Sequence, residues 1–398
     1  MIDLARGARE LELAERVRRF VRDEVIPYEK DPRVERHGPN DDLRREMQAK
    51  AKAAGLLALH LDREFGGQGL SHRETATVFR EAGYSLLGAT ALNCMAPDEG
   101  NMFLLSKAGT PAQKERFLRR MATGEIRSAF FMTEPDGGAG SDPSMLATTA
   151  TPDGNGWVIN GRKWLITGAD GAGVGLVMAK TEGVDGKGSA TIFLVPLPHP
   201  GVRTDRVLDT IDRTMPGGHG VMTLENVRVT ADDILGELDQ GFKYAQIRLA
   251  PARLTHCMRW WGAAKRAHDI ACDYARTRLA FGKTLIEHEG VGFMLAENEI
   301  ALKQAELMID WCAYVLDQGA PGTEESSMAK VAVSEALFGI ADRCVQVLGG
   351  MGVTDDTPVH QIFRDLRAFR IYDGPTEVHK WSIASRIRKR PQVFGQRA

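Results

Sequence analysis

The feature that most constrains the fold is a double change of hydrophobic period along the chain. Apolar residues fall at helical spacing over about the first 125 residues, as at Leu13, Val17 and Phe20. The pattern then changes to short β-branched runs, such as GLVMAK and ATIFLVPL, separated by Gly, Pro and Asn. Long helical runs return after about Gly241. The order helical, β, helical is therefore expected.

We predict three domains from this order: an N-terminal helical domain over 1–128, a central β domain over 129–238 and a C-terminal helical bundle over 239–398. The bundle's predicted long helices are apolar on more than one face, which indicates burial in a large core or in subunit contacts. Within the β domain, Asn160-Gly161 predicts a two-residue hairpin turn, because Asn and Gly tolerate positive φ.

Composition argues against several classes of protein. The 51 basic and 53 acidic side chains give a formal charge of −2, so neither nucleic acid nor an anionic membrane is expected as the main partner. The five cysteines lie far apart without a Cys-x-x-Cys pair, which favours a reducing cytoplasm and predicts neither a disulfide framework nor a metal site. No run approaches the ~18 apolar residues of a membrane span.

One carboxylate stands out as a candidate base. Asp373 lies between Tyr372 and a Gly374-Pro375 turn, after a helical, Arg-rich run. A helix must stop before this proline, so the side chain of Asp373 can leave a rigid helix end. The alternative is that Asp-Gly-Pro is only a helix-stopping turn.

The glycine-rich run GADGAGVG, residues 168–175, is not expected to bind a dinucleotide. A Rossmann loop leads from a strand into a helix, whereas the strand-like GLVMAKT follows here. A nucleotide cofactor would have to be held in another way.

Five motifs resemble those of the acyl-CoA dehydrogenase family, in that family's order: FFMTEPDGGAGSD, GRKWLITGA, RLAFGKTLIEHE, QVLGGMG and RIYDGPTEVH. NCMAPDEGNM, APARLTHCMR and the Asp-Gly-Pro resemble the branch of family members ten and eleven, which has aspartate where most members have a glutamate base. The resemblance implies a mainly α fold with a β domain: an N-terminal helical domain, a central β-barrel or sandwich and a C-terminal four-helix bundle.

The resemblance also implies FAD as cofactor, lying between the β domain and the bundle and partly covered by a neighbouring subunit. The implied FAD contacts are Phe131, Met132, Thr133, Ser141, Trp164, Thr167, Arg278, Phe281, Glu289, Gln346, Gly349, Gly350, Pro375 and Glu377. The implied substrate contacts are Ser141, Arg253, Tyr372 and Gly374. The commoner loop TEPGAGSD is two residues shorter, most simply by Asp136 and Gly137, and Leu165 stands where the family often has tryptophan.

The implied reaction forms a 2,3-enoyl-CoA from an acyl-CoA. Asp373 takes the α-proton, and the β-hydride goes to flavin N5. Some members carry the base on the helix one residue before the substrate-side arginine, but that residue is Ala252 here. We expect backbone N–H groups within 373–376 to hold the thioester carbonyl, and burial beside the flavin to raise the pKa of Asp373 toward the working pH.

The implied partners are an electron-transfer flavoprotein and further copies of the chain, as a homotetramer or homodimer in fatty acid metabolism. Three alternatives share the fold: a nitroalkane oxidase, which also uses an aspartate base, an acyl-CoA oxidase, which is normally longer, and a DNA-associated flavoprotein, which the near-zero charge disfavours. The branch implies long-chain, 4-hydroxy or 4-phosphorylated acyl groups, and the sequence does not choose among them.

Overall fold

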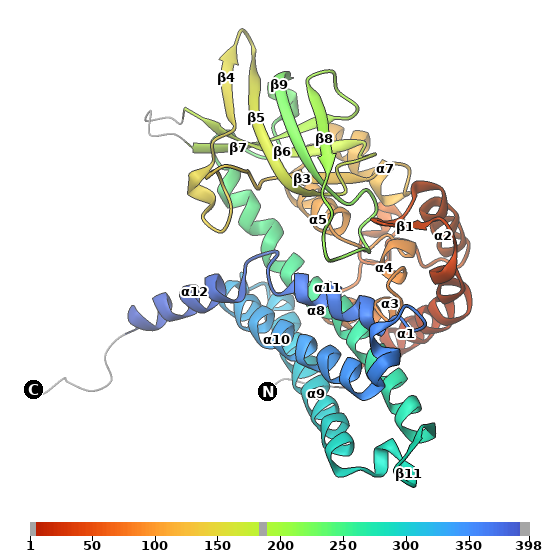
Figure 1. Cartoon of the computed structure of the whole chain (residues 1–398). Coiled ribbons are helices and arrows are strands. Elements are labelled where there is room, and N and C mark those ends of the chain that lie inside the picture. The colour runs from red at the N-terminus through yellow and green to blue at the C-terminus, as the bar shows by residue number, and fades with distance from the viewer. Residues whose placement is uncertain (1–4, 183–188, 391–398) are drawn as a thin grey trace, which may run out of the picture.

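The computed structural model describes residues 5–182 and 189–390. Helices form both ends of the chain and a curled sheet lies between them in sequence (Figure 1). The N-terminal helices are α1 (Ala8–Phe20), α2 (Asp41–Ala53), α3 (His72–Ala82), α4 (Gly88–Ala91), α5 (Asp98–Ala108), α6 (Pro111–Gln113) and α7 (Arg119–Ala122). Side-chain caps begin α2 and α3, where Asn40 accepts from Leu43 N and Ser71 from Glu74 N.

The central sheet has seven strands in the order β3-β6-β4-β5-β9-β8, with β7 paired to β6. The strands are β3 (Ser128–Phe131), β4 (Thr149–Asp153), β5 (Gly156–Thr167), β6 (Val174–Thr181), β7 (Ser189–Pro196), β8 (Val202–Val207) and β9 (His219–Thr230). A short β1 (Val34–Glu35) pairs with β2 (Gly38–Pro39) outside this sheet. The run 168–175 leads into strand β6, as expected of a loop that is not a Rossmann fingerprint.

The hairpin predicted at Asn160-Gly161 is wrong. Strand β5 continues through both residues, and the register with β9 shifts between Ile159 and Gly161, so the pair forms a bulge. The turn between β4 and β5 lies earlier, at Gly154 and Asn155, where Gly154 has φ +58°.

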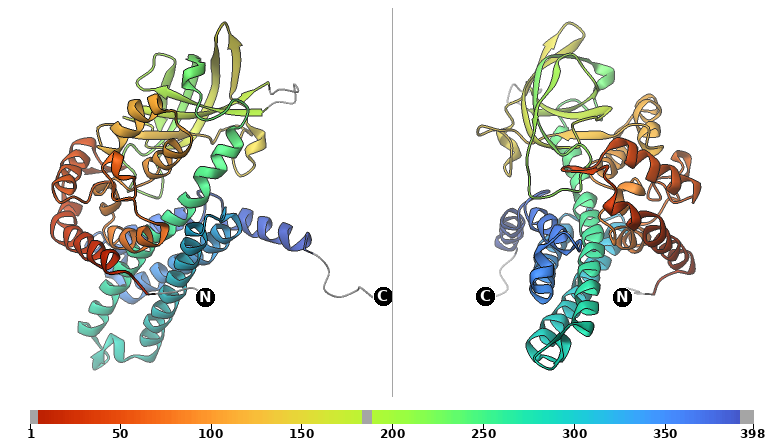
Figure 2. Two further views of the ribbon diagram at one scale, coloured as in Figure 1. Left: turned by 180° about the vertical axis from the view of Figure 1, so that it is seen from behind. Right: turned by 45° about the vertical axis from the view of Figure 1, so that its right-hand side comes forward.

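The C-terminal part is a bundle of long helices, built from α8 (Gly241–Thr277), α9 (Glu289–Asp317), α10 (Thr323–Leu348), α11 (Val359–Phe369) and α12 (Thr376–Arg388). A small hairpin of β10 (Leu279–Ala280) and β11 (Lys283–Thr284) joins α8 to α9 at the tip farthest from the sheet (Figure 1). Both views in Figure 2 show α8 running from beside the sheet into the bundle. The long α8 therefore connects the sheet with the far tip.

Two hydrophobic cores hold the chain together. The larger core joins the N-terminal helices to the bundle, and the smaller one lies within the β domain. In the part of the chain that is described, no helix is both long and apolar enough to cross a lipid bilayer. Within those same residues, no cluster of three His, Cys, Asp or Glu side chains is placed to hold a metal ion.

Candidate active site

Asp373 lies in the turn between α11 and α12. Helix α11 ends at Phe369, four residues before Asp373, and Pro375 is the N-cap residue of α12. The helix therefore stops before it reaches the Gly-Pro pair, and Asp373 lies in the turn that follows the helix end. The backbone of Asp373 has φ +52°, a left-handed conformation that aspartate adopts more readily than most residues. Its side chain keeps 20% of its surface exposed.

The backbone of this turn is fixed by side chains from three helices. Arg253 Nε donates to the carbonyl oxygen of Asp373 at 3.1 Å, and His379 Nε2 donates to the same oxygen at 3.2 Å. Lys330 Nζ donates to Phe369 O at 2.6 Å and to Gly374 O at 3.4 Å. Burial lowers the pKa of Lys330 to about 8. The turn is therefore held from α8, α10 and α12.

The carboxylate of Asp373 has a positive environment. His256 Nε2 lies 3.2 Å from Asp373 Oδ2. Desolvation raises the pKa of Asp373, but the hydrogen bond from His256 and the charges of Arg248 and Arg253 outweigh it, so the pKa lies well below its usual value. The expectation of a raised pKa is wrong, because partners on α8 stabilise the charged form.

Tyr372 points into the protein interior. Its hydroxyl accepts a hydrogen bond from Trp260 Nε1, and its ring lies 4.9 Å from the His256 ring and 5.6 Å from the Phe369 ring. Burial raises the pKa of Tyr372 well above its usual value. The tyrosine thus packs against the His256 ring.

The loop after β3 is attached to β5 by a buried ion pair. Lys163 Nζ lies 2.8 Å from Glu134 Oε1 and donates to Met132 O at 3.2 Å, and Trp164 N donates to Thr133 O at 3.0 Å. The two additional residues lie at an exposed tip of this loop, where Asp136 has φ +57° and Gly137 φ +84°. The insertion therefore leaves the anchored part of the loop in place.

Thr167, at the end of β5, begins a hydrogen-bonded series. Its Oγ1 is 3.0 Å from His219 Nδ1, and His219 Nε2 is 2.8 Å from Asp212 Oδ2. Two residues earlier, Leu165 is 42% exposed at φ +53°, so it presents an open apolar side chain where the family often has tryptophan.

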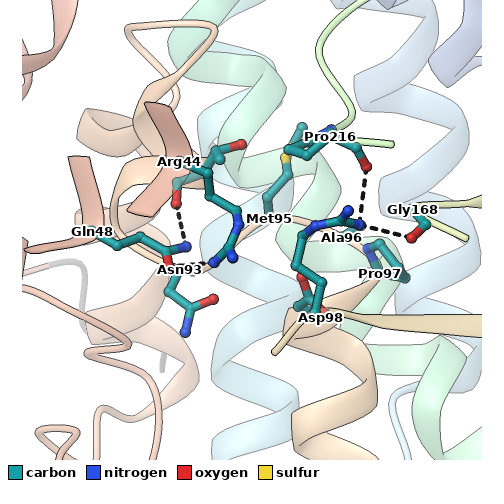
Figure 3. Close-up of a pocket in the computed structure, with 11 residues that line it drawn as sticks. Arg44, Gln48, Asn93, Met95, Ala96, Pro97, Asp98, Gly168 and Pro216 are labelled. Carbon is teal, nitrogen blue, oxygen red and sulfur yellow. Dashed lines mark hydrogen bonds between the residues drawn. The ribbon is translucent and has the colours of Figure 1, made fainter. Parts of the chain in front are cut away.

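A small cavity lies beside Gly168, the residue that follows β5, and is otherwise lined largely by residues of the N-terminal helices and their loops (Figure 3). Its volume of about 20 Å³ suits roughly one water molecule, so it can hold neither a flavin nor an acyl chain. Arg127 lines this cavity and donates to Gly168 O at 2.7 Å and to Pro216 O at 3.4 Å, and Figure 3 draws both bonds as dashed lines ending at the labelled Gly168 and Pro216. The cavity thus belongs to the support of the end of β5.

The chain brings only some of the predicted site residues together. Arg253, Tyr372, Gly374, Pro375 and Glu377 lie at or beside the Asp373 turn. The β-domain side reaches this turn through Arg248, whose guanidinium lies 4.3 Å from the Phe130 ring centroid. Phe130 directly precedes the predicted FAD contacts Phe131, Met132 and Thr133 in the chain. Three more predicted contacts lie in the loop after β3 and in strand β5, namely Ser141, Trp164 and Thr167.

The other predicted FAD contacts lie far from that turn. Arg278 follows α8, whose rise of about 1.5 Å per residue separates it from Arg253 by roughly 36 Å. Phe281 is 97% exposed, and Glu289 begins α9 beside the same tip. Gln346, Gly349 and Gly350 are exposed at the end of α10, roughly 24 Å from Lys330 by the same rise. One copy of the chain does not join these two groups.

Four important residues were not predicted as site residues: His256, Arg248, Lys330 and Glu99. His256 is one histidine in the APARLTHCMR motif, and a lone histidine does not by itself indicate a site. A signal existed in APARLTHCMR, because Arg253, His256 and Arg259 are spaced by three and so lie on successive turns of one helix. Lys330 carries no such signal, since its role depends on the packing of α10 against α11.

Family models match nearly the whole chain. The acyl-CoA dehydrogenase N-terminal domain matches residues 8–125, the middle domain 129–227 and the C-terminal domain 239–388. The chain is 38% identical to the probable acyl-CoA dehydrogenase FadE2 of Mycobacterium tuberculosis, covering 96% of both chains. It is 35% identical to acyl-CoA dehydrogenase family member 11 of Rattus norvegicus over 96% of this chain, but it spans about half the length of that relative.

Solved structures agree with these matches. A Mycobacterium abscessus protein, provisionally called an acyl-CoA dehydrogenase, superposes with a TM-score of 0.89 at 37% identity and covers 97% of this chain and 99% of its own. A glutaryl-CoA dehydrogenase of Mycobacterium smegmatis, solved in complex with FADH2, has a TM-score of 0.86 at 25% identity and covers 98% of this chain and 96% of its own.

The fold and its relatives define a flavin-dependent oxidoreductase that acts on CH–CH bonds. The chain belongs to the acyl-CoA dehydrogenase family, and its cofactor is FAD. The residues present suit this cofactor. The Arg278 guanidinium makes no hydrogen bond or ion pair within the described residues, and the Phe281 ring beside it is open, as a diphosphate and an adenine would need.

Proposed function

We propose that this chain is an acyl-CoA dehydrogenase in which Asp373 removes the α-proton of an acyl-CoA, giving a 2,3-enoyl-CoA. Bound FAD supplies the acceptor for the β-hydride. The observation that carries the proposal is the placing of Asp373: a partly exposed carboxylate on a turn fixed by Arg253, Lys330 and His379. A base held in this way can meet the α-carbon in a defined geometry.

The low pKa of Asp373 affects how this base would work. The carboxylate stays ionised across the working pH range, but it is a weak base, so the site must make the α-proton more acidic. Among the described residues, neither the N–H of Asp373 nor that of Gly374 donates a hydrogen bond, whereas Thr376 N donates to Arg370 O. The two open N–H groups are our candidates for holding the thioester carbonyl, and such donors contribute on the order of 3 kcal/mol each.

We further propose that the working molecule is a homodimer or homotetramer. The predicted FAD contacts fall into two groups too far apart to share one cofactor within a copy, so Arg278 and Phe281 would act on the cofactor of a neighbour. Helix α12 projects from the body of the molecule, and its Trp381 is 71% exposed (Figures 1 and 2). Exposed apolar side chains at both places suit subunit contacts.

The remaining proposals concern the setting of the reaction. We propose an electron-transfer flavoprotein as electron acceptor and fatty acid metabolism as the pathway class. We also propose the cytoplasm as the compartment, because the five cysteines are all free thiols, which suits a reducing compartment.

An acyl-CoA panel tests the function. Anaerobic addition of short-chain, long-chain and 4-hydroxy acyl-CoAs should bleach the oxidised flavin for at least one compound. Bleaching by nitroalkanes alone would point to the nitroalkane oxidase alternative, and rapid peroxide formation in air would contradict the electron-transfer flavoprotein. Salt-dependent binding of DNA without any bleaching would favour the DNA-associated flavoprotein.

A further inference from the structure

We propose that His256 is a positioning residue for Asp373, and that NCMAPDEGNM and APARLTHCMR together build the buried series of hydrogen bonds and ion pairs that holds His256. The first motif, residues 93–102, contributes the start of α5, and the second, residues 250–259, lies within α8. The inference rests on the proposed function, because it takes Asp373 as the base. It gives the two motifs a joint physical role.

The chain of contacts starts at Glu99 and ends on the base. Glu99 Oε2 accepts from Thr255 Oγ1 at 2.8 Å and lies 3.6 Å from Arg259 Nη1. Arg259 Nη1 donates to Cys94 O at 2.9 Å, and Arg259 Nη2 lies 3.2 Å from His256 Nδ1. His256 Nε2 then lies 3.2 Å from Asp373 Oδ2. Glu99, His256 and Arg259 each expose less than 5% of their surface, so water does not compete with these contacts.

This geometry assigns the histidine tautomer. A guanidinium can only donate hydrogen bonds, so His256 Nδ1 must be the acceptor toward Arg259. The ring proton is therefore on Nε2, the nitrogen that lies 3.2 Å from Asp373 Oδ2. Burial lowers the pKa of His256, and a second proton on Nδ1 would face the Arg259 charge. His256 is thus a neutral donor to the base.

The same helix α5 also positions a cation beside Asp373. Asn101 Oδ1 accepts from Arg248 Nε at 2.8 Å, and Asn101 Nδ2 donates to Ser128 Oγ at 2.9 Å. Asn101 thereby ties Arg248 to the start of β3. The start of α5 holds two groups that act on one carboxylate: His256, through Arg259, and Arg248 directly.

The protonation of His256 and Asp373 depends on every charged or titratable group around these two side chains. The groups facing it are Arg248, Arg253 and Arg259 of α8, Glu99 of α5, Lys330 of α10, His379 of α12 and Tyr372 of the turn. With Oδ2 engaged by His256, Asp373 can present Oδ1 to a substrate. Loss of the donor would free the carboxylate to rotate and would remove the strongest single influence that keeps it ionised.

His256→Leu tests the inference against two companions. His256→Gln keeps an amide N–H that can reach Asp373, and His268→Gln is the matched control, a buried histidine of the same helix paired with Glu299 away from the site. Flavin reduction would be followed in a single turnover from pH 5 to 9, using the acyl-CoA of the panel that reduces the wild-type protein fastest. We expect His256→Leu to lower the plateau rate by about tenfold or more and to move the acid half-point to higher pH. His256→Gln should restore most of the plateau rate and reverse most of the shift in the acid half-point, and His268→Gln should match wild type in both.

The outcomes separate this inference from the proposed function. If Asp373→Asn abolishes reduction while His256→Leu keeps the wild-type plateau and half-point, His256 does not position the base, and the function stands. If Asp373→Asn reduces flavin normally, the proposed function itself fails. A measurement on the wild-type holoenzyme covers the case of a variant that does not fold: ¹⁵N spectra of labelled histidine should show His256 protonated at Nε2 alone. Protonation at both nitrogens, or at Nδ1 alone, would overturn the inference.

Discussion

Among single residues, Asp365 and Asp373 show how strongly local partners decide whether a carboxyl group is ionised. Asp365 accepts from Arg213 N and Gln361 Nε2 on one oxygen, while its other oxygen has no partner among the described residues. Burial raises the pKa of Asp365 to about 8, whereas His256 holds the pKa of Asp373 far below its usual value. Both lie within one nine-residue segment.

Asp365→Asn should change how the free energy of unfolding depends on pH. A folded-state pKa of about 8 lies above the ordinary value of 3.8, so the contribution of Asp365 is fully present below about pH 4 and is lost as the pH rises toward 8. The amide removes this loss. Urea unfolding at pH 5.5 and pH 8 should show the variant gaining on the order of 1–3 kcal/mol relative to wild type between the two conditions. If the difference in free energy of unfolding between variant and wild type is the same at pH 5.5 and pH 8, Asp365 ionises with its ordinary pKa.

At this scale the sequence predicts a candidate base but not the charge around it. Asp373 stands out as a candidate because Gly374 and Pro375 cannot continue a helix, although α11 already ends at Phe369. The direction of its pKa shift could not be predicted, because the decisive groups come from α8, about 120 residues earlier in the chain. A short sequence motif predicts the backbone conformation around it, whereas the charge around a side chain is set by tertiary packing.

At the scale of elements, the contact between α3 and α8 fixes the helix that carries His256. Gly83 follows α3 and Gly262 lies in α8, and the backbones touch there. A Cβ atom on Gly262 would lie 2.1 Å from Arg80 O, and one on Gly83 would lie 1.8 Å from Arg259 O. The sequence places both glycines near predicted helices but does not say which backbones meet. The Asn160-Gly161 bulge was mispredicted for the same reason, since pairing with β9 decided it.

Gly262→Ala should therefore destabilise the protein by about 1–3 kcal/mol or more, because backbone atoms must move. Gly339→Ala is the matched control: it also lies within a long helix, but its nearest neighbour is the flexible end of Arg343 at 3.6 Å. Alanine there should stabilise the helix by roughly 0.5–1 kcal/mol. The melting temperatures of the two variants test this prediction. An equal change of melting temperature in Gly262→Ala and Gly339→Ala would contradict the close packing of α3 on α8.

At the scale of the whole molecule, the long α8 separates two groups of flavin motifs. The order helical, β, helical was predictable from hydrophobic period alone, and the family fold confirms it. The distance between the motifs was not predictable, because a motif gives no length of helix between itself and the site. An assembly in which the tip of one copy meets the sheet side of another would bring both groups together.

Arg278→Ala should weaken FAD retention, since a charge-assisted contact to the cofactor is lost. Arg276→Ala is the control, because Arg276 lies two residues earlier and pairs instead with Asp273. The ratio of flavin to protein absorbance after gel filtration measures FAD retention. Light scattering should give a mass of two or four times the 43.7 kDa of one chain. A monomer that keeps its FAD equally well with alanine at either position would contradict the shared cofactor site.

The central claim is that Asp373 is the α-proton base, and anaerobic single-turnover reduction of the flavin in Asp373→Asn tests it most directly. Asparagine keeps the size of the side chain and can still receive the hydrogen bond from His256, but it cannot accept the proton. The claim predicts full FAD content and a rate of flavin bleaching by the best acyl-CoA at least ~10²-fold below wild type. Bleaching of the Asp373→Asn protein at near the wild-type rate would show that the base lies elsewhere.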